Sequence, residues 1–261
     1  MLNKMLAGIA ATVATIATQS AVAADLPVKA GPVPVVAAAY NWTGIYVGLN
    51  FGGGWTDSDY LNTANTTAFG DVAGPPGFSA RTDGFVGGGQ IGANWQIGNF
   101  VIGAEAMLDH ANMRGRVNPL RGGPPPVGQD DNFQTRMRAV FLGTGRIGFA
   151  WDTALLYAKG GYAGADVEVK VADTVGVNQG AGTSSGWRSG YTFGGGVEYG
   201  FRFAPGLSAA VEYNYIRLDS ASYQLAGTAA PLLYTFNVDT HDTHMVTGRL
   251  NYRFSWFGLL H

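Results

Sequence analysis

A strict alternation of side-chain type between Trp187 and Phe203 restricts what this chain can fold into. Odd-numbered positions carry mostly aromatic and aliphatic side chains, whereas even-numbered positions carry glycine, threonine, arginine and glutamate. Because successive side chains of a β-strand point to opposite faces, this period of two predicts a strand with one apolar and one polar face. Helical spacing does not separate the two kinds of residue in this way.

The same alternation recurs in seven further stretches, so the sequence predicts eight strands. The others cover Thr43–Phe51, Phe85–Gln96, Phe100–Leu108, Arg136–Trp151, Leu155–Val171, Leu207–Tyr215 and Val246–Phe254. In one of them, Leu155–Val171, the apolar residues lose their phase near Gly160 and Gly161. This change predicts a β-bulge at the two glycines.

The connections between the predicted strands alternate in length. Three are tight and lie at 97–99, 151–154 and 204–206, whereas four are long, polar and rich in Gly and Pro, at 56–80, 112–131, 172–186 and 219–242. An even number of antiparallel strands with short turns at one rim and long loops at the other is the plan of an outer-membrane barrel. We therefore predict an all-β fold: an eight-stranded antiparallel transmembrane β-barrel over residues 41–254, with short periplasmic turns and four long extracellular loops.

The alternation alone does not say which face is outside, because a soluble β-sandwich would bury the apolar face. Glycine is concentrated on the polar face, where it weakens a strand but makes room inside a narrow barrel. Aromatic residues stand at strand ends on the apolar face, as in the girdles of membrane barrels. The chain has 40 glycines and 13% charged residues. A lipid-facing exterior explains both values, so we expect the apolar face to be outside.

The inward parity then collects charged residues of both signs. Buried charges are tolerated when they are paired and hydrogen-bonded, so we expect a salt-bridge network that plugs the lumen. Its expected members are Glu105, Arg136, Arg138, Arg146, Lys159, Glu198, Arg202, Glu212, Arg249 and Arg253.

The first residues have the features of an export signal. Lys4 is followed by the short apolar stretch Leu6–Ala17 and by the small-x-small sequence Ala21-Val22-Ala23. Residues 1–23 are therefore predicted to be a cleaved signal peptide, since the apolar run is short for a membrane anchor, which is the alternative. Residues 24–40 are rich in Ala and Pro and are interpreted as a periplasmic segment. The expected location is the outer membrane of a Gram-negative bacterium.

Six short motifs are spread along the chain: 24–27 (ADLP), 41–48 (NWTGIYVG), 145–148 (GRIG), 156–157 (LY) with 160–161 (GG), 194–199 (GGGVEY) and 251–254 (NYRF). Together they resemble a known family, the OmpA-like eight-stranded β-barrels identified as outer-membrane immunogenic or porin-family proteins of alphaproteobacteria. The resemblance spans essentially the whole mature chain, and it implies a surface-exposed structural protein. Such barrels commonly stop at or near a terminal aromatic residue, whereas here the tail 255–261 follows Phe254. Tyr252 and Phe254 are the candidate assembly signal, and Trp256 or Phe257 are alternatives to Phe254.

Other chemical motifs are weak. The segments 87–92 and 143–148 match G-x-G-x-x-G, but they lie inside alternating strands and do not open a helix, as nucleotide binding requires. His241 and His244 stand beside the carboxylates of Asp239 and Asp242 and could bind a metal or haem iron, although a polar loop is the simpler interpretation. The formal net charge of −2 gives no sign of nucleic-acid binding. No nucleophile elbow is present. We expect no cofactor and no enzymatic activity.

These observations predict a structural protein that contributes to envelope integrity and displays surface loops. A narrow pore for ions or small solutes is one alternative. A surface adhesin or a haem- or metal-binding protein that acts through its loops is another. The expected partners are outer-membrane lipid, lipopolysaccharide and the outer-membrane assembly machinery, and we expect a monomer.

Overall fold

The computed structural model describes residues 40–62, 77–117, 132–173, 180–226 and 233–254. At the strand ends 60–62, 77–78, 132–133, 171–173, 180–182, 221–226 and 233–241 it describes the backbone alone. The predicted signal peptide, most of the Ala- and Pro-rich segment and the tail 255–261 lie outside the described residues. None of the described residues forms a helix long and apolar enough to cross a membrane.

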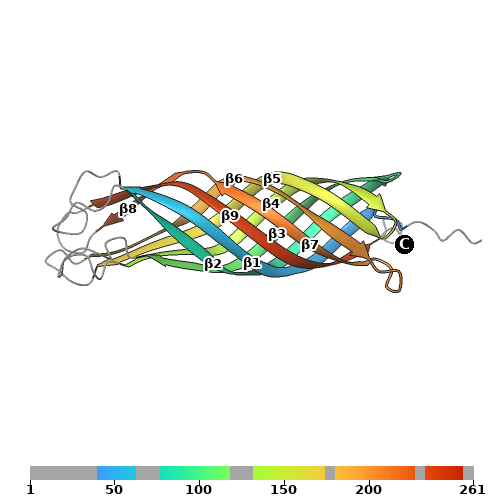
Figure 1. Ribbon diagram of the computed structural model, residues 1–261, viewed down its shortest axis with the longest axis horizontal. Coiled ribbons are helices and arrows are strands. Elements are labelled where there is room, and N and C mark those ends of the chain that lie inside the picture. Colours follow the sequence, from blue (N-terminus) through green and yellow to red (C-terminus); the bar gives the residue numbers. More distant parts are fainter. Residues whose placement is uncertain (1–39, 63–76, 118–131, 174–179, 227–232, 255–261) are drawn as a thin grey trace, which may run out of the picture. The chain divides into compact units, whose positions relative to one another are not determined.

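Eight long strands form a closed antiparallel barrel, which confirms the predicted fold class (Figure 1). Each strand pairs with the next along the chain, β7 pairs with β9, and β9 pairs with β1 to close the sheet. A ninth, short strand, β8, extends the sheet beside the first residues of β9. The strands are β1 (Gly44–Asn62), β2 (Gly77–Ile97), β3 (Phe100–Val117), β4 (Asn132–Trp151), β5 (Ala154–Asp173), β6 (Gly180–Gly200), β7 (Leu207–Leu218), β8 (Ala221–Ala226) and β9 (Leu233–Phe254).

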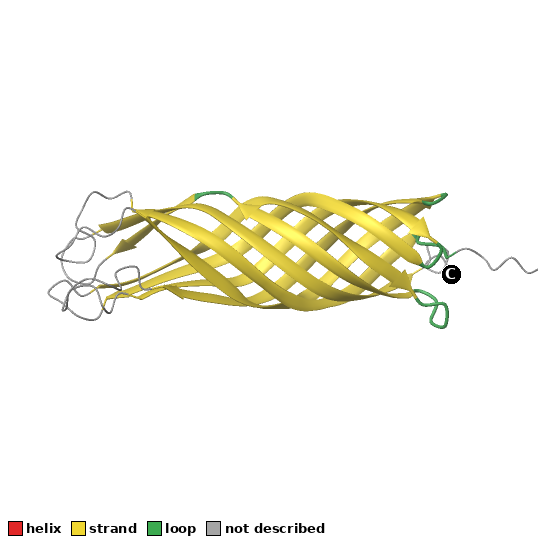
Figure 2. Ribbon diagram, viewed as in Figure 1, coloured by secondary structure: helices red, strands yellow, loops and turns green. Residues whose placement is uncertain are grey.

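Tight turns join the strands at one end of the barrel, which we call the short-turn end; the opposite end is the loop end. Figure 2 shows the described loops at the short-turn end, on the right. The turns there use left-handed backbone conformations, with φ of 61° at Gly98, 54° at Asp152 and 90° at Gly206. The turns at 97–99 and 151–154 are found where the sequence places them, whereas the third connection, predicted at 204–206, runs over residues 201–206.

The strands run much further toward the loop end than predicted. Most of them have 18 to 22 residues, and they include large parts of the segments expected to be loops. Twenty residues at a tilt of about 40° span about 50 Å, roughly twice the apolar band of about 25 Å of an outer-membrane barrel. About half of the barrel therefore extends beyond an apolar band of that height.

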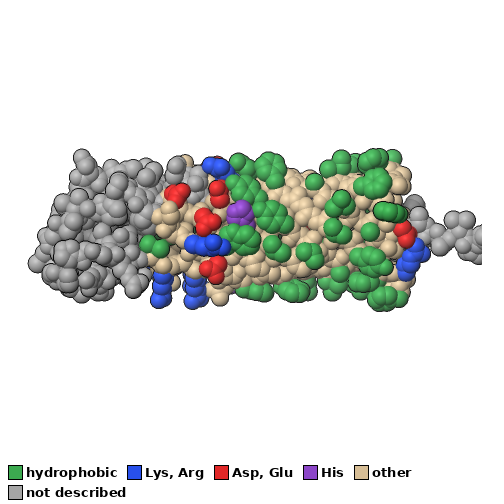
Figure 3. Space-filling view, in the orientation of Figure 1, with side chains coloured by type: hydrophobic (Ala, Val, Ile, Leu, Met, Phe, Trp, Pro, Cys, Tyr) green, Lys and Arg blue, Asp and Glu red, His purple; other side chains and the backbone are tan. Residues whose placement is uncertain are grey.

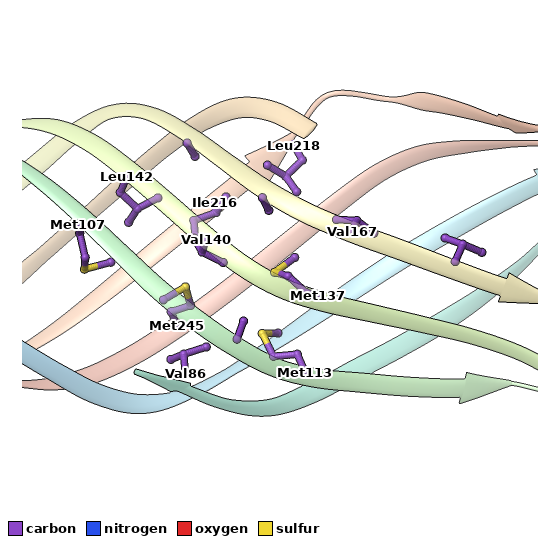
Figure 4. Close-up of a cluster of buried hydrophobic side chains, with 14 of the residues drawn as sticks. Val86, Met107, Met113, Met137, Val140, Leu142, Val167, Ile216, Leu218 and Met245 are labelled. Carbon is purple, nitrogen blue, oxygen red and sulfur yellow. The ribbon is translucent and has the colours of Figure 1, made fainter. Parts of the chain in front are cut away.

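The barrel inverts its polarity between these two halves. Near the short-turn end the exterior is apolar and aromatic (Figure 3), whereas the buried interior holds charged and amide side chains. Toward the loop end the exterior carries charged side chains, and the interior holds an apolar cluster that includes Met113, Met137, Val167 and Met245 (Figure 4). Each half therefore buries the kind of side chain that its surroundings would not accept.

The bulge predicted at Gly160 and Gly161 is wrong. The pairing of β5 with β4 and with β6 runs through both glycines without a shift. The shift lies instead between Met137 and Ala139, where Arg138 is an extra residue of β4 relative to β5. The pairing of β3 with β4 also shifts at this level, between His110 and Met113 of β3. The apolar residues of β5 change parity because the polarity of the barrel inverts along the strand, while the strand itself keeps its phase.

Candidate functional site: the closed barrel interior

Four charged side chains from four different strands meet in the middle of the barrel. Lys159 on β5 donates to Glu105 Oε1 on β3 at 3.0 Å and to Glu212 Oε1 on β7 at 2.7 Å. Arg249 on β9 donates to the other oxygen of each of the same two carboxylates. All four side chains are at most 1% exposed. Each carboxylate is therefore held between two cations.

Two tyrosines complete the coordination of these carboxylates. Tyr46 donates to Glu105 and Tyr157 donates to Glu212, each at 2.6 Å. The Arg146 guanidinium lies over both rings, with Cζ 4.7 Å from the Tyr46 centroid and 5.0 Å from the Tyr157 centroid. Such cation–π contacts strengthen when water is excluded, as it is for these buried groups.

A chain of amide side chains extends the network around the wall. Arg146 donates to Asn94 at 2.8 Å and lies 3.5 Å from Glu198 Oε2. The other Glu198 oxygen accepts hydrogen bonds from Ser208 at 2.5 Å and from Asn251 at 2.9 Å. From Asn251 the hydrogen bonds continue through Gln90 and Asn50 to Asp109. We call all these groups together the central network.

The central network balances its charges almost completely. Arg146, Lys159 and Arg249 face the carboxylates of Glu105, Glu198 and Glu212, and Asp109 stands at the edge. A buried ion pair recovers the cost of desolvation when further hydrogen bonds satisfy its atoms. The tyrosine partners fill this role for Glu105 and Glu212. Among the described residues, Nη1 and Nη2 of Arg146, Nε of Arg249, Oε2 of Glu198 and Oδ2 of Asp109 have no hydrogen-bond partner.

Glycines on the inward face make room for these large side chains. A Cβ at Gly92 would collide with the hydroxyl of Tyr46, and one at Gly196 would touch the hydroxyl of Tyr157. The glycines of the polar face thus lie where side chains of the central network approach the backbone closely.

The predicted lumen residues divide into two groups. Glu105, Arg146, Lys159, Glu198, Glu212 and Arg249 lie together in the barrel interior. The other four, Arg136, Arg138, Arg202 and Arg253, do not belong to the central network.

Arg136 and Arg138 do not point into the lumen. Counting parity back from Arg146 assigns them to the inner face, but the extra residue in β4 reverses that count. Met137, between them, is buried in the apolar cluster, and Arg138 pairs with Asp166 at 2.9 Å and Glu168 at 3.3 Å. The prediction that these two arginines belong to the lumen network is therefore corrected.

Arg202 and Arg253 belong to the short-turn end. Arg202 is exposed in the loop before β7 and pairs with Asp152 of the β4–β5 turn. Arg253 points inward but lies over the rings of Tyr40 and Trp42, with Cζ 4.6 and 5.5 Å from the centroids.

Several members of the central network were not named from the sequence. Asp109 and Tyr157 share the inward parity of Glu105 and Lys159 on their strands, whereas Tyr46 lies on β1, which carries no predicted lumen charge. Asp109 is four residues from Glu105 on β3, so the alternation could have identified it. The tyrosines are harder to find, because their rings match the apolar set while their hydroxyls serve the polar one.

A cap closes the lumen at the short-turn end. Trp42 is 1% exposed and packs with Val101, Ala150, Leu155 and Tyr157. Its indole donates to the Asp152 carbonyl at 3.2 Å, and its backbone N–H donates to Gln96 Oε1 at 2.7 Å. The described interior is therefore filled in three layers: this cap, the central network and the apolar cluster.

His244 faces outward, away from the lumen. Its ring stacks on Trp55 at 5.2 Å, and its Nδ1 lies 2.7 Å from the Tyr213 hydroxyl. The side chain of His241 lies outside the described part of the chain. Among the described residues, no three His, Asp or Glu side chains are placed to hold a metal ion.

The candidate assembly signal lies at the end of the closing strand. Tyr252 and Phe254 are exposed on the outer face of β9, with ring centroids 5.0 Å apart. Their backbones pair with Val47 and Ile45 of β1. They thus lie on the seam that closes the barrel.

A closed antiparallel barrel with an apolar girdle and a polar interior defines the class of outer-membrane β-barrel proteins. A family model described as outer membrane protein beta-barrel domain matches residues 9–254, so the chain belongs to this family. The protein is located in the outer membrane of Gram-negative bacteria.

The curated relatives agree with this assignment. The chain is 30% identical over 208 residues to the 31 kDa outer-membrane immunogenic protein of Brucella melitensis biotype 1, and equally to that of Brucella suis biovar 1. Each alignment covers 76% of this chain and 80% of the relative. Among solved structures, the outer membrane protease OmpT of Escherichia coli is similar with a TM-score of 0.51 and 11% identity, covering 81% of this chain and 97% of that one. At this identity the likeness shows the fold alone.

Proposed function

We propose that this outer-membrane protein is a structural component of the cell envelope whose lumen is closed by its own side chains, without catalytic activity. The central network carries this proposal. It joins β3, β5, β7 and β9 through side chains that exclude solvent, so it fills the barrel cross-section. The Brucella relatives are named for their immunogenicity, and we propose that this chain likewise displays its long loops at the cell surface.

The alternative function is a narrow pore for ions or small solutes. An electrical measurement can distinguish such a pore from a closed structural barrel. Passage through the barrel would require the Trp42 cap, the central network and the apolar cluster all to open. An ion would also have to cross the apolar layer without water or polar partners, which is unfavourable. We therefore expect the wild-type protein to be silent in planar bilayers.

The test compares the wild type with a variant whose network is emptied, Glu105→Ala with Glu212→Ala and Arg249→Ala. A denaturing gel with and without heating first shows whether each protein has folded, because a folded barrel migrates differently before heating. We expect no conductance steps for the wild type. Regular steps from folded wild-type protein would overturn the proposal in favour of a pore.

The role in the envelope has its own test. A strain that lacks the protein should become more sensitive to detergent, and the wild-type gene should restore its resistance. Unchanged sensitivity would contradict the structural role.

We further propose that the barrel is a monomer and that the assembly machinery recognises Tyr252 and Phe254. Replacing both by alanine should slow insertion of the barrel into the outer membrane. The control variant Tyr213→Ala should reach the surface at the wild-type level.

A further inference from the structure

Four arginines gather on the outside of three neighbouring strands toward the loop end. They are Arg81 on β2, Arg114 and Arg116 on β3, and Arg136 on β4, and we call them the arginine cluster. Arg114 stands opposite Arg136 in the β3–β4 register. Arg81 lies beside Gly115, because a Cβ on that glycine would collide with the Arg81 carbonyl oxygen.

The arginine cluster lacks partners within the described part of the chain. None of its guanidinium groups makes an ion pair with a described carboxylate, and the Nε atom of Arg136 is buried without a hydrogen-bond acceptor. Other cations on the same outer surface are paired: Arg138 with Asp166, Lys170 with Glu168, and Arg217 with Asp242. The missing partners are thus a property of the arginine cluster and not of every cation at this level.

Carboxylates border the arginine cluster but leave its charge uncompensated. Asp83 stands opposite Arg114 and Asp57 stands opposite Arg81, and neither forms an ion pair with it. Glu168 stands opposite Arg136, but it already pairs with Arg138 and Lys170. Like charges directly opposite each other on neighbouring strands are destabilising. An anion between Arg114 and Arg136 would remove this repulsion.

The height of the arginine cluster on the barrel points to the source of that anion. Phe85 pairs with Asn112, and the Asp83–Arg114 pair comes two residues further along the same strands. Two residues of a tilted strand rise about 5 Å along the barrel axis. Arg114 therefore lies about 5 Å, and Arg81 about 10 Å, above the exposed Phe85 of the apolar girdle. The headgroup layer extends roughly 5–8 Å beyond the hydrocarbon. Because short turns face the periplasm in such barrels, the layer concerned is that of the outer leaflet.

We infer that the arginine cluster binds the phosphate groups of a phosphorylated glycolipid in the outer leaflet of the outer membrane. Guanidinium groups offer parallel N–H donors that match phosphate oxygens in pairs. The apolar girdle below Arg114 would hold the acyl chains of the same lipid. One lipid would thus be bound by both its headgroup and its chains, next to strands β2, β3 and β4.

The experiment uses the full-length barrel purified from outer membranes in mild detergent. The test variant carries Arg81→Gln, Arg114→Gln and Arg136→Gln. The matched control carries Arg138→Gln, Lys170→Gln and Arg217→Gln, which removes the same charge from paired positions on the same outer surface. Phosphorylated glycolipid that remains bound is extracted and measured by mass spectrometry per mole of barrel, after heat-dependent gel migration has shown that each protein is folded.

We expect the test variant to retain less glycolipid by about tenfold or more, because it lacks three of the cations that attract an anionic surface. The control should retain most of its glycolipid. Equal retention by the test variant and the wild type, or an equal loss in the control, would overturn the inference.

A second arm identifies the source of the phosphate. Delipidated wild-type protein is heated in the presence of inorganic phosphate alone, a phosphorylated glycolipid, or the same glycolipid after dephosphorylation. We expect the phosphorylated glycolipid alone to raise the unfolding temperature. An equal rise with inorganic phosphate would indicate a free-anion site, and an equal rise with the dephosphorylated lipid would indicate acyl-chain binding; either result contradicts the assignment.

Discussion

Glu105 and Arg249 form an ion pair across the interior of the barrel, although their strands, β3 and β9, are not neighbours in the sheet. Lys159 and Glu212 connect β5 and β7 to the same pair. These contacts tie together walls that backbone hydrogen bonds connect only around the circumference. The central network therefore closes the lumen and also fixes the positions of the strands around it.

Glu212→Gln should destabilise the barrel strongly. The substitution keeps the size of the side chain but leaves Lys159 and Arg249 with one shared carboxylate, Glu105. Removing one partner of a buried ion pair costs about 3–5 kcal/mol. Denaturant unfolding of the protein in lipid vesicles measures the free energy. The exposed acid Asp219 provides the control, and Asp219→Asn should change the stability by less than about 0.5 kcal/mol. Equal effects of the two substitutions would show that the central network does not stabilise the fold.

Asp109→Asn should behave in the opposite way. Asp109 is fully buried, and its Oδ1 accepts a hydrogen bond from Asn50 at 2.8 Å, whereas its Oδ2 has no partner among the described residues. An amide of the same shape keeps the bond from Asn50 and buries no charge. We therefore expect unchanged or increased stability in the same unfolding assay. A loss of more than about 2 kcal/mol in the free energy of unfolding would contradict this prediction, because it would mean that the negative charge of Asp109 stabilises the fold.

The parity of the sequence predicts the membrane half of the barrel well. Val211 and Tyr213 alternate with Glu212 and Asn214, and the structure has the first pair outside and the second pair inside. One rule, apolar outside and polar inside, is enough to assign these residues. The same rule correctly assigns six of the ten predicted charges to the central network.

The rule fails beyond the membrane, because the physical surroundings change there. Along β3, Leu108 faces outward toward lipid, whereas Met113 faces inward into the apolar cluster. Both side chains avoid water, although their positions have opposite parity. Read with a single rule, such a strand either ends or acquires a bulge. For this reason, a single rule for all positions predicts strands that are too short and a bulge at Gly160. The real bulge at Arg138 shows only in the pairing of the strands, which the sequence of one strand does not reveal.

The apolar cluster at the loop end should contribute to stability like the core of a water-soluble protein. Met113→Ala removes a fully buried side chain and should cost about 2–5 kcal/mol in denaturant unfolding. The neighbouring Asn112→Ala, on the exposed outer face of the same strand, should change little. If both substitutions had small effects, the loop-end half of the barrel would not fold cooperatively with the membrane half.

The pair of Asp152 and Arg202 at the short-turn end should give a pH-dependent contribution to stability. The hydrogen bond from Arg202 holds the pKa of the Asp152 carboxyl below its usual range. Because the pKa is lower in the folded than in the unfolded chain, the contribution is present above the usual range of an aspartate and is lost as the pH falls through the folded pKa. Asp152→Asn removes the charge, and asparagine still accepts the positive φ of 54° at this turn. The unfolding temperature of the wild type should therefore exceed that of the variant at neutral pH, and the two should converge on acidification.

Arg202→Gln should remove the same pH-dependent difference, since it deletes the hydrogen-bond donor to Asp152. A difference between wild type and Asp152→Asn that stayed constant down to the most acidic pH would show that the ion pair does not contribute.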